Sequence, residues 1–389
     1  EMCIRDRRII NQLRGKNMIK SIKVALLAMI GLAFTASAYA DFTFVSWGGA
    51  YTMSQQKAYI DTWGPVKNGT TKVSVENYNG GLGEVKAQVE SGNVTWDVVD
   101  ILPVDAINGC DEGLLEELDF SSWEKDPKGN SFLDSIPDNG TGTSGTISPC
   151  AAPQIWWTYV VIFDPNAFPG KKPKRMKDFF DVEKFPGKRG VHTWPQAVLE
   201  MALVADGVKP NKVNNILQST GGTDRAFAKL EDLKGHVVHW SAGAQPLELV
   251  SSGEVVMSIV YNGRAGAAIL SEGASFDYIW EGQVLDGDWV AIPKGSKNKA
   301  EAIEFLKHAT TCASQAEQAK YITYGPMRTC GLDIIKKNEP WFHNGIAVLP
   351  HMPNTKKRLK KSILTDPVWW ADHNAELKEQ WTAWMAGNK

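Results

Sequence analysis

The chain has 389 residues, with 42 Lys and Arg against 44 Asp and Glu. This length is sufficient for two lobes, each with a hydrophobic core of its own. The slightly acidic balance argues against nucleic acid and against anionic membrane surfaces as partners.

The N-terminal segment has the features of a secreted precursor. Residues 1–17, whose start matches the translation of a common sequencing adapter, are expected to be a non-native leader. Residues 18–40 combine a basic start, an apolar run at 24–34 that is too short to cross a bilayer, and a small-x-small motif at 38–40. We therefore expect a signal peptide, a periplasmic location and a mature chain that begins near Asp41.

Four cysteines lie beyond this segment, namely Cys110, Cys150, Cys312 and Cys330. An even number in an oxidising compartment predicts two disulfides, for which the sequence allows three connectivities. Pairing Cys110 with Cys150 and Cys312 with Cys330 is favoured because a local loop is easiest to close. A metal site is not expected, since no C-x-x-C spacing is present.

The first third of the chain alternates strands and helices. Strands are predicted at 42–46, 73–77 and 97–102, and helices at 53–63 and 82–91, the second closed by Gly92. This alternation predicts a mostly parallel sheet with its ligand crevice at the carboxyl ends of the strands. The loops after the first two strands are therefore the first places to look for a ligand.

The rest of the chain begins with an irregular excursion at 119–149, followed by an aromatic strand at 155–163 that we expect to cross between lobes. Further strands are predicted at 235–240, 255–261 and 290–293, and helical segments at 199–230, 246–252 and 299–311.

A family resemblance emerges from eight short motifs in this order: 92–100 (GNVTWDVVD), 110–115 (CDEGLL), 185–190 (FPGKRG), 242–246 (AGAQP), 253–257 (GEVVM), 261–264 (YNGR), 291–296 (AIPKGS) and 324–326 (YGP). Together they resemble the spermidine/putrescine-type solute-binding proteins of ABC importers, over essentially all of 41–389.

The resemblance implies a two-lobe α/β fold, with a mixed, mostly parallel sheet flanked by helices in each lobe and the ligand in the cleft. The N-terminal lobe is expected at 41–155 plus 289–324, and the C-terminal lobe at 156–288 plus 325–389. It further implies a monomer without a cofactor that delivers ligand to an inner-membrane permease and its ATPase. In agreement, no G-x-S-x-G, H-E-x-x-H or P-loop motif marks an enzyme, although an extracellular hydrolase stays an alternative.

The family's binding pocket can be carried over by position. Aromatic faces attract ammonium groups, and the chain has 15 Trp. Asp288 stands where the family places an amine-binding carboxylate. The predicted ligand-binding residues are Trp47, Tyr51, Trp157, Trp194, Trp240, Tyr261, Arg264, Asp288, Tyr324 and Trp369, and no catalytic residue is predicted.

Two departures from the family pattern bear on the ligand. Where the polyamine binders have acidic residues before a Met-Ala-Leu helix, this chain has Trp194 and Ala197. Arg264 replaces a small residue and suits a carboxylate, unless it forms a structural ion pair.

The sequence thus predicts a small amine-containing ligand, with a polyamine as the main reading and a γ-aminobutyrate-like ω-amino acid as the alternative. A sugar would stack on the same tryptophans. Ferric ion would need a tyrosine pair, for which Tyr321 and Tyr324 are the only close candidates.

Overall fold

The computed structural model describes residues 40–137 and 145–387. The predicted leader and, apart from Ala40, the predicted signal peptide lie outside the described residues. Residues Asp41–Lys389 form one compact unit that contains the sheet and the cavities. None of the helices in the described part of the chain has the length and apolarity that a bilayer crossing requires.

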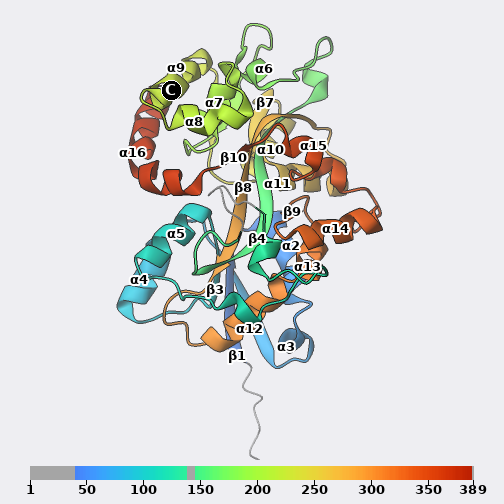
Figure 1. The fold of residues 1–389 in the computed structure, drawn as a ribbon. Coiled ribbons are helices and arrows are strands. Elements are labelled where there is room, and N and C mark those ends of the chain that lie inside the picture. Colours follow the sequence, from blue (N-terminus) through green and yellow to red (C-terminus); the bar gives the residue numbers. More distant parts are fainter. Residues whose placement is uncertain (1–39, 138–144, 388–389) are drawn as a thin grey trace, which may run out of the picture. The chain divides into compact units, whose positions relative to one another are not determined.

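A single ten-stranded sheet forms the centre of this unit, with the main order β2-β1-β3-β8-β4-β7-β5-β6 (Figure 1). The strands are β1 (Ala40–Ser46), β2 (Thr71–Asn77), β3 (Val98–Ile101), β4 (Ala151–Phe163), β5 (Arg189–His192), β6 (Val237–Trp240), β7 (Met257–Tyr261), β8 (Asp277–Ala291), β9 (Gly325–Pro326) and β10 (Ile363–Leu364).

Helices cover this sheet. They are α2 (Gly49–Gln55), α3 (Gly64–Lys67), α4 (Gly83–Ser91), α5 (Pro103–Asp111), α6 (Met176–Phe180), α7 (Val198–Ala205), α8 (Val213–Leu217), α9 (Gly222–Leu230), α10 (Gln245–Ser251), α11 (Asn262–Ala267), α12 (Lys299–Ala309), α13 (Cys312–Gln318), α14 (Thr329–Asn338), α15 (Lys356–Leu359) and α16 (Pro367–Ala386). The predicted helix at 53–63 begins earlier, as α2, and continues as a π-helical turn over Gln56–Ile60. Gly92 ends α4 in the left-handed conformation, as predicted.

The two longest strands join two sets of shorter ones. β4 and β8 pair antiparallel from Ala151↔Ala291 to Phe163↔Asp277. β3 adds to the end of β8, and β7 adds to the second half of β4. The outer pairs β1–β3, β5–β6 and β5–β7 are parallel. The α/β class and the mixed sheet are confirmed, and the parallel pairs lie on either side of the antiparallel β4–β8 pair.

The length of β8 was not predicted, because only 290–293 was expected as a strand. Its interior carries Asp286 and Asp288, which break the apolar pattern of a buried strand. Both carboxylates are nevertheless buried and hydrogen-bonded: Gln196 Nε2 donates to Asp286 at 2.7 Å, and Trp157 Nε1 donates to Asp288 at 3.0 Å. These partners make the burial of the carboxylates tolerable.

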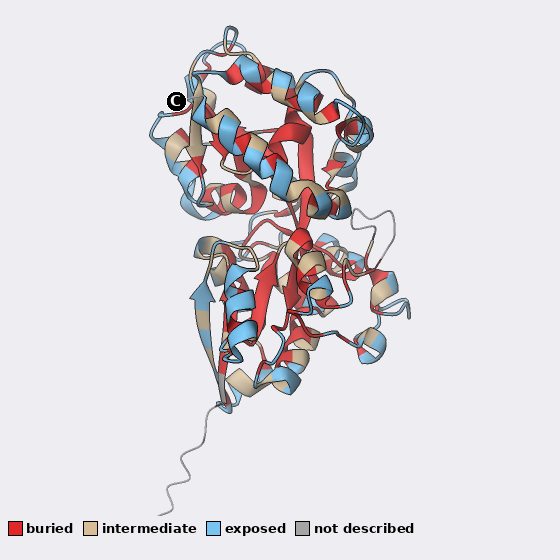
Figure 2. Ribbon diagram, turned by 90° about the vertical axis from the view of Figure 1, so that its left-hand side faces the viewer, coloured by how far each residue is buried: buried red, intermediate tan, exposed pale blue. Residues whose placement is uncertain are grey.

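Most buried apolar side chains fall into two large clusters. One contains β1, β3 and α12, with Phe42 and Phe44 packed 5.4 and 5.6 Å from the ring of Phe305. The larger one contains α7, β5 and part of α16. Figure 2 shows the sheet as mostly buried and the outer faces of the helices as exposed. The lobe bounds drawn from the sequence stay a prediction.

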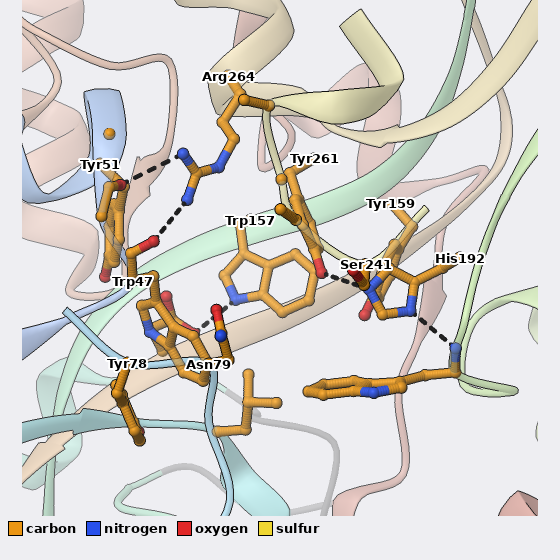
Figure 3. Close-up of a pocket in the computed structure, with 18 of the residues that line it drawn as sticks. Trp47, Tyr51, Tyr78, Asn79, Trp157, Tyr159, His192, Ser241, Tyr261 and Arg264 are labelled. Carbon is orange, nitrogen blue, oxygen red and sulfur yellow. Dashed lines mark hydrogen bonds between the residues drawn. The ribbon is translucent and has the colours of Figure 1, made fainter. Parts of the chain in front are cut away.

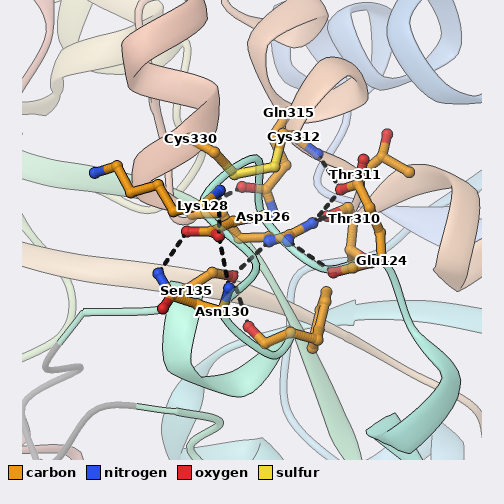
Figure 4. The surroundings of a disulfide bond; sticks show 12 residues. Glu124, Asp126, Lys128, Asn130, Ser135, Thr310, Thr311, Cys312, Gln315 and Cys330 are labelled. Carbon is orange, nitrogen blue, oxygen red and sulfur yellow. Dashed lines mark hydrogen bonds and ion pairs between the residues drawn. A yellow bond between two sulfur atoms is a disulfide. The ribbon is translucent and has the colours of Figure 1, made fainter.

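Both predicted disulfides are present, Cys110–Cys150 and Cys312–Cys330. The first closes the predicted irregular excursion. Beside the second, the buried Arg328 donates to the hydroxyl of Ser135 at 2.8 Å and to the carbonyl of Thr310 at 3.1 Å, and it pairs with Glu124 (Figure 4). The excursion is therefore fixed to the core by a guanidinium as well as by sulfur.

Candidate functional site

A cavity of about 270 Å³ opens where β4, β8 and the loops after β1, β5 and β6 meet (Figure 3). Its walls are mostly aromatic, with one cation and one carboxylate. The lining side chains are Trp47, Tyr51, Tyr78, Asn79, Leu102, Trp157, Tyr159, His192, Trp194, Ser241, Tyr261, Arg264, Asp288 and Tyr324, and Gly48, Gly49 and residues 242–244 complete the wall.

Eight of the ten predicted binding residues line this cavity. Trp240 and Trp369 are not among the residues that line it. Trp240 is buried behind the wall, with its ring 4.4 Å from that of His192 and 5.5 Å from that of Tyr261. Trp369 lies in the first turn of α16, and its ring stacks on that of His373 at 4.6 Å. A run of two tryptophans was insufficient to tell a wall residue from a helix-packing residue.

Arg264 on α11 reaches the loop that follows β1. Its guanidinium donates to the carbonyl oxygens of Gly48 at 3.3 Å and Trp47 at 3.2 Å. Its Nε is buried without a hydrogen-bond partner. No ion pair joins Arg264 to a carboxylate among residues 40–137 and 145–387. The structural ion pair considered from the sequence is therefore absent from the described residues.

Two glycines make room for this guanidinium. A Cβ on Gly243 would lie 2.5 Å from Arg264 Nε, and a Cβ on Gly49 would lie 2.8 Å from its Nη1. Gly49 also has a φ of +60°, which disfavours other residues. The position of Arg264 thus depends on small residues in two separate loops.

Asp288 supplies the negative charge of the cavity. Its side chain is buried, and one carboxylate oxygen accepts the Trp157 Nε1 hydrogen bond. Burial raises the pKa of Asp288 to about 7, although the hydrogen bonds of Tyr51 and Trp157 and the charge of Arg264 act in the opposite direction. Asp100 lies behind it, where burial and the charge of Asp288 raise its pKa as well.

His192 and Tyr261 form a neutral, hydroxyl-bearing part of the wall. The backbone N–H of Trp194 donates to His192 Nδ1 at 2.9 Å, so the ring proton is assigned to Nε2, which lies 3.2 Å from the Tyr261 hydroxyl. Burial lowers the pKa of His192 to about 3 and keeps the ring uncharged. The Tyr261 hydroxyl therefore accepts from His192 and keeps its own proton for another acceptor.

The sequence reasoning missed several wall residues, namely Asn79, Leu102, Tyr159, His192, Ser241 and 242–244. Tyr159 had a usable signal, since it lies two residues after Trp157 in a strand and so faces the same side. His192 is the last residue of β5 and Ser241 directly follows β6, at the carboxyl ends of the strands where ligands are expected. Tyr78 lies in a loop that the sequence had already singled out.

Comparison with known proteins shows the family. Residues 58–340 match the bacterial extracellular solute-binding protein model. A Pseudomonas aeruginosa protein named gamma-aminobutyric acid-binding protein is 35% identical over 363 residues, which cover 92% of this chain and 96% of that protein.

Solved structures of solute-binding proteins are also similar to this chain. An ABC transporter substrate-binding protein from Bradyrhizobium japonicum is 31% identical with a TM-score of 0.75, covering 89% of this chain and 99% of that one. A structure described as a GABA receptor is 31% identical with a TM-score of 0.72, covering 88% and 97%. These relatives support the solute-binding family, but not the spermidine/putrescine type that the sequence motifs had indicated.

The chain therefore belongs to the bacterial extracellular solute-binding proteins, the periplasmic substrate-binding components of ABC importers, which deliver small ligands to a membrane permease and are not enzymes.

Proposed function

We propose that this chain captures a small ω-amino acid of the γ-aminobutyrate class and delivers it to an inner-membrane permease with its ATPase. The carboxylate of the ligand binds Arg264, its ammonium group binds Asp288, and its alkyl chain lies between aromatic rings. The observation that carries this proposal is that Arg264 lines the cavity without a carboxylate partner among the described residues, while Asp288 lines the same cavity.

Arg264 suits a carboxylate for a geometric reason. A guanidinium has five N–H donors in a planar fork, which can hold a carboxylate by two parallel hydrogen bonds. Two of these N–H groups lie on carbonyl oxygens at 3.2 and 3.3 Å, and Nε is buried without a partner. A bound carboxylate would satisfy donors that the protein leaves unused.

Asp288 suits an ammonium group because it is the carboxylate of an aromatic cavity. Trp157 Nε1 donates a hydrogen bond to its carboxylate, and neighbouring rings present faces that attract a cation. The name of the Pseudomonas aeruginosa relative, a gamma-aminobutyric acid-binding protein, supports the same ligand class.

The other ligand classes fit the cavity less well. A polyamine would place a second ammonium group near Arg264, where like charges repel. A sugar needs neither Arg264 nor Asp288. The tyrosine pair considered for ferric ion is not assembled in the cavity, because Tyr321 stacks on His343 at 5.8 Å instead of lining it.

The proposal includes closure of two lobes with the bounds expected from the sequence. Arg264 of α11, in the expected C-terminal lobe, donates hydrogen bonds to the loop after β1, in the expected N-terminal lobe. These hydrogen bonds would break when the lobes open and form again when they close. Ligand binding would favour the closed form by its differential affinity for that form. Solution scattering should show a smaller radius of gyration with γ-aminobutyrate than without it.

Calorimetric titration with γ-aminobutyrate and putrescine tests the ligand class. Arg264→Ala should weaken γ-aminobutyrate binding by about 2–5 kcal/mol, because a buried carboxylate loses its charged partner. The same change should leave putrescine binding unchanged or stronger. Arg225→Ala is a matched control, since Arg225 lies at the surface and pairs with Asp206. Binding of putrescine without binding of γ-aminobutyrate by the unmodified protein would contradict the proposal.

A further inference from the structure

A second cavity, of about 730 Å³, lies away from the first, between the segment before α6, the first half of β8 and the segment around α15. Its charged wall residues are Lys174, Arg175, Glu281, Lys357, Arg358 and Lys361. The sequence argument against anionic partners used the net charge of the whole chain. The fold instead brings together two basic segments, 171–177 and 356–361, that are far apart in sequence.

Most of the positive charge of this cavity is not compensated by carboxylates. Among the described residues, no ion pair joins Lys174, Arg175, Lys357 or Lys361 to a carboxylate. Glu281 is the one acidic residue of the lining set, and its carboxylate already accepts the backbone N–H of Met176 at 3.2 Å. An excess of lysine and arginine therefore faces the cavity.

The cavity is also built on a fixed floor. Tyr278 and Trp280 stack at 4.6 Å, and the Arg358 guanidinium lies 3.8 Å from the centre of the Trp280 ring. Arg358 donates to the carbonyl oxygens of Leu349 at 3.1 Å and Met352 at 2.6 Å. These contacts hold the guanidinium in place before any ligand arrives.

One polar atom of the floor has no partner. The hydroxyl of Tyr278 is buried and makes no hydrogen bond. Because this hydroxyl has almost no accessible surface, the polar contacts that the cavity offers to a ligand come from its cationic side chains.

The segment around α15 is tied to β8 at several points. Gly282 donates its N–H to the carbonyl of Lys361 at 3.2 Å, and Gln283 donates to the carbonyl of Pro353 at 3.1 Å and to Ser362 at 2.6 Å. The lysines at 357 and 361 therefore project from a backbone that the sheet holds.

We infer that this cavity binds a phosphate-bearing anion. Several cations without partners favour a multiply charged oxyanion over a single carboxylate, and lysine and arginine are the residues that hold phosphate groups. The phosphate can belong to a small soluble molecule or to the headgroup of an anionic phospholipid. The inference is independent of the amino-acid site and does not rest on the proposed function.

The test uses the purified chain and two pairs of substitutions. Calorimetry at low ionic strength should detect saturable pyrophosphate binding that weakens as salt is added. Lys357→Ala with Lys361→Ala should weaken it about ten-fold or more. Lys67→Ala with Lys72→Ala removes the same charge from an exposed region elsewhere and should leave it unchanged. Thermal unfolding at an unaltered midpoint will show that all variants are folded.

Vesicles distinguish the two sources of the phosphate. Sedimentation with phosphatidylcholine vesicles that contain phosphatidylglycerol, but not with phosphatidylcholine alone, assigns the cavity to a lipid headgroup. Pyrophosphate binding without vesicle binding assigns it to a soluble anion. Absence of both, or equal loss in the two pairs of variants, overturns the inference.

Discussion

The two cavities of this chain differ in how they combine charge and shape. The first is smaller, about 270 Å³, with aromatic walls and one cation and one carboxylate. The second is about 730 Å³, and its wall carries five cations and one carboxylate. The first offers opposite charges at defined positions, which selects a ligand by the arrangement of its groups. The second offers an excess of one charge, which selects by charge alone.

Removing the carboxylate of the first cavity should produce the largest difference between the two cavities in ligand affinity. Asp288→Ala leaves the ligand ammonium buried and unpaired, so γ-aminobutyrate affinity should fall by about 2–5 kcal/mol. Pyrophosphate binding in the second cavity should not change. Asp277→Ala, an exposed carboxylate at the start of the same strand, is the control. Calorimetry measures both, and equal losses from the two substitutions would show that the effect is not local to the first cavity.

A smaller loss is expected when the guanidinium is displaced without removal of its charge. Gly243→Ala places a Cβ 2.5 Å from Arg264 Nε, so the side chain has to shift. Affinity for γ-aminobutyrate should fall by about 1–3 kcal/mol, the usual cost of overpacking. Gly170→Ala, where a Cβ meets nothing within 4 Å, should be neutral. Unchanged affinity in the Gly243 variant would mean that Arg264 does not hold the ligand in this position.

The cavities should also differ in their response to pH. Because the pKa of Asp288 is raised to about 7, the carboxyl is protonated below that pH in the empty protein and has to lose a proton to bind an ammonium group. γ-Aminobutyrate affinity should therefore fall about ten-fold, or about 1.4 kcal/mol, for each pH unit below 7. Above 7 it should be constant, since the amine keeps its charge.

The same shift has a consequence for stability. A carboxyl with a raised pKa in the folded state stabilises the fold at low pH, below its unfolded value near 4, and this contribution is lost as pH rises through about 7. Asp288→Asn should abolish both trends. Titrations and urea denaturation from pH 5 to 8 measure them, and a flat affinity profile in the unmodified protein would refute the role of Asp288.

The sequence could predict what depends on local pattern. The buried strand at 155–163 and the end of α4 at Gly92 follow from neighbouring residues, and the structure confirms them. The two disulfides have the pairing that the shorter loops favoured among three possible connectivities. Eight wall residues were also named, because strand ends and family motifs mark them.

What depends on contacts distant in sequence could not be predicted. The pattern of β8 is broken by carboxylates whose burial is possible only because Gln196 and Trp157 reach them. Trp240 and Trp369 differ from wall tryptophans only in what lies next to them in space. The second cavity is a third example, because the net charge of the whole chain does not show where lysine and arginine side chains come together in the fold.

The strand β8 carries elements of both cavities: Tyr278 and Trp280 near its start, Asp288 near its end. The partners of Tyr278 and Asp288 on β4 are Ile162 and Ile155, which are seven residues apart because β8 is bulged between them. At about 3.3 Å per residue, this separation corresponds to roughly 23 Å along the sheet. The covalent backbone thus acts as a spacer between the two cavities. If the second cavity binds a phosphate-bearing surface, the length of this spacer sets the distance between that surface and a ligand in the first cavity.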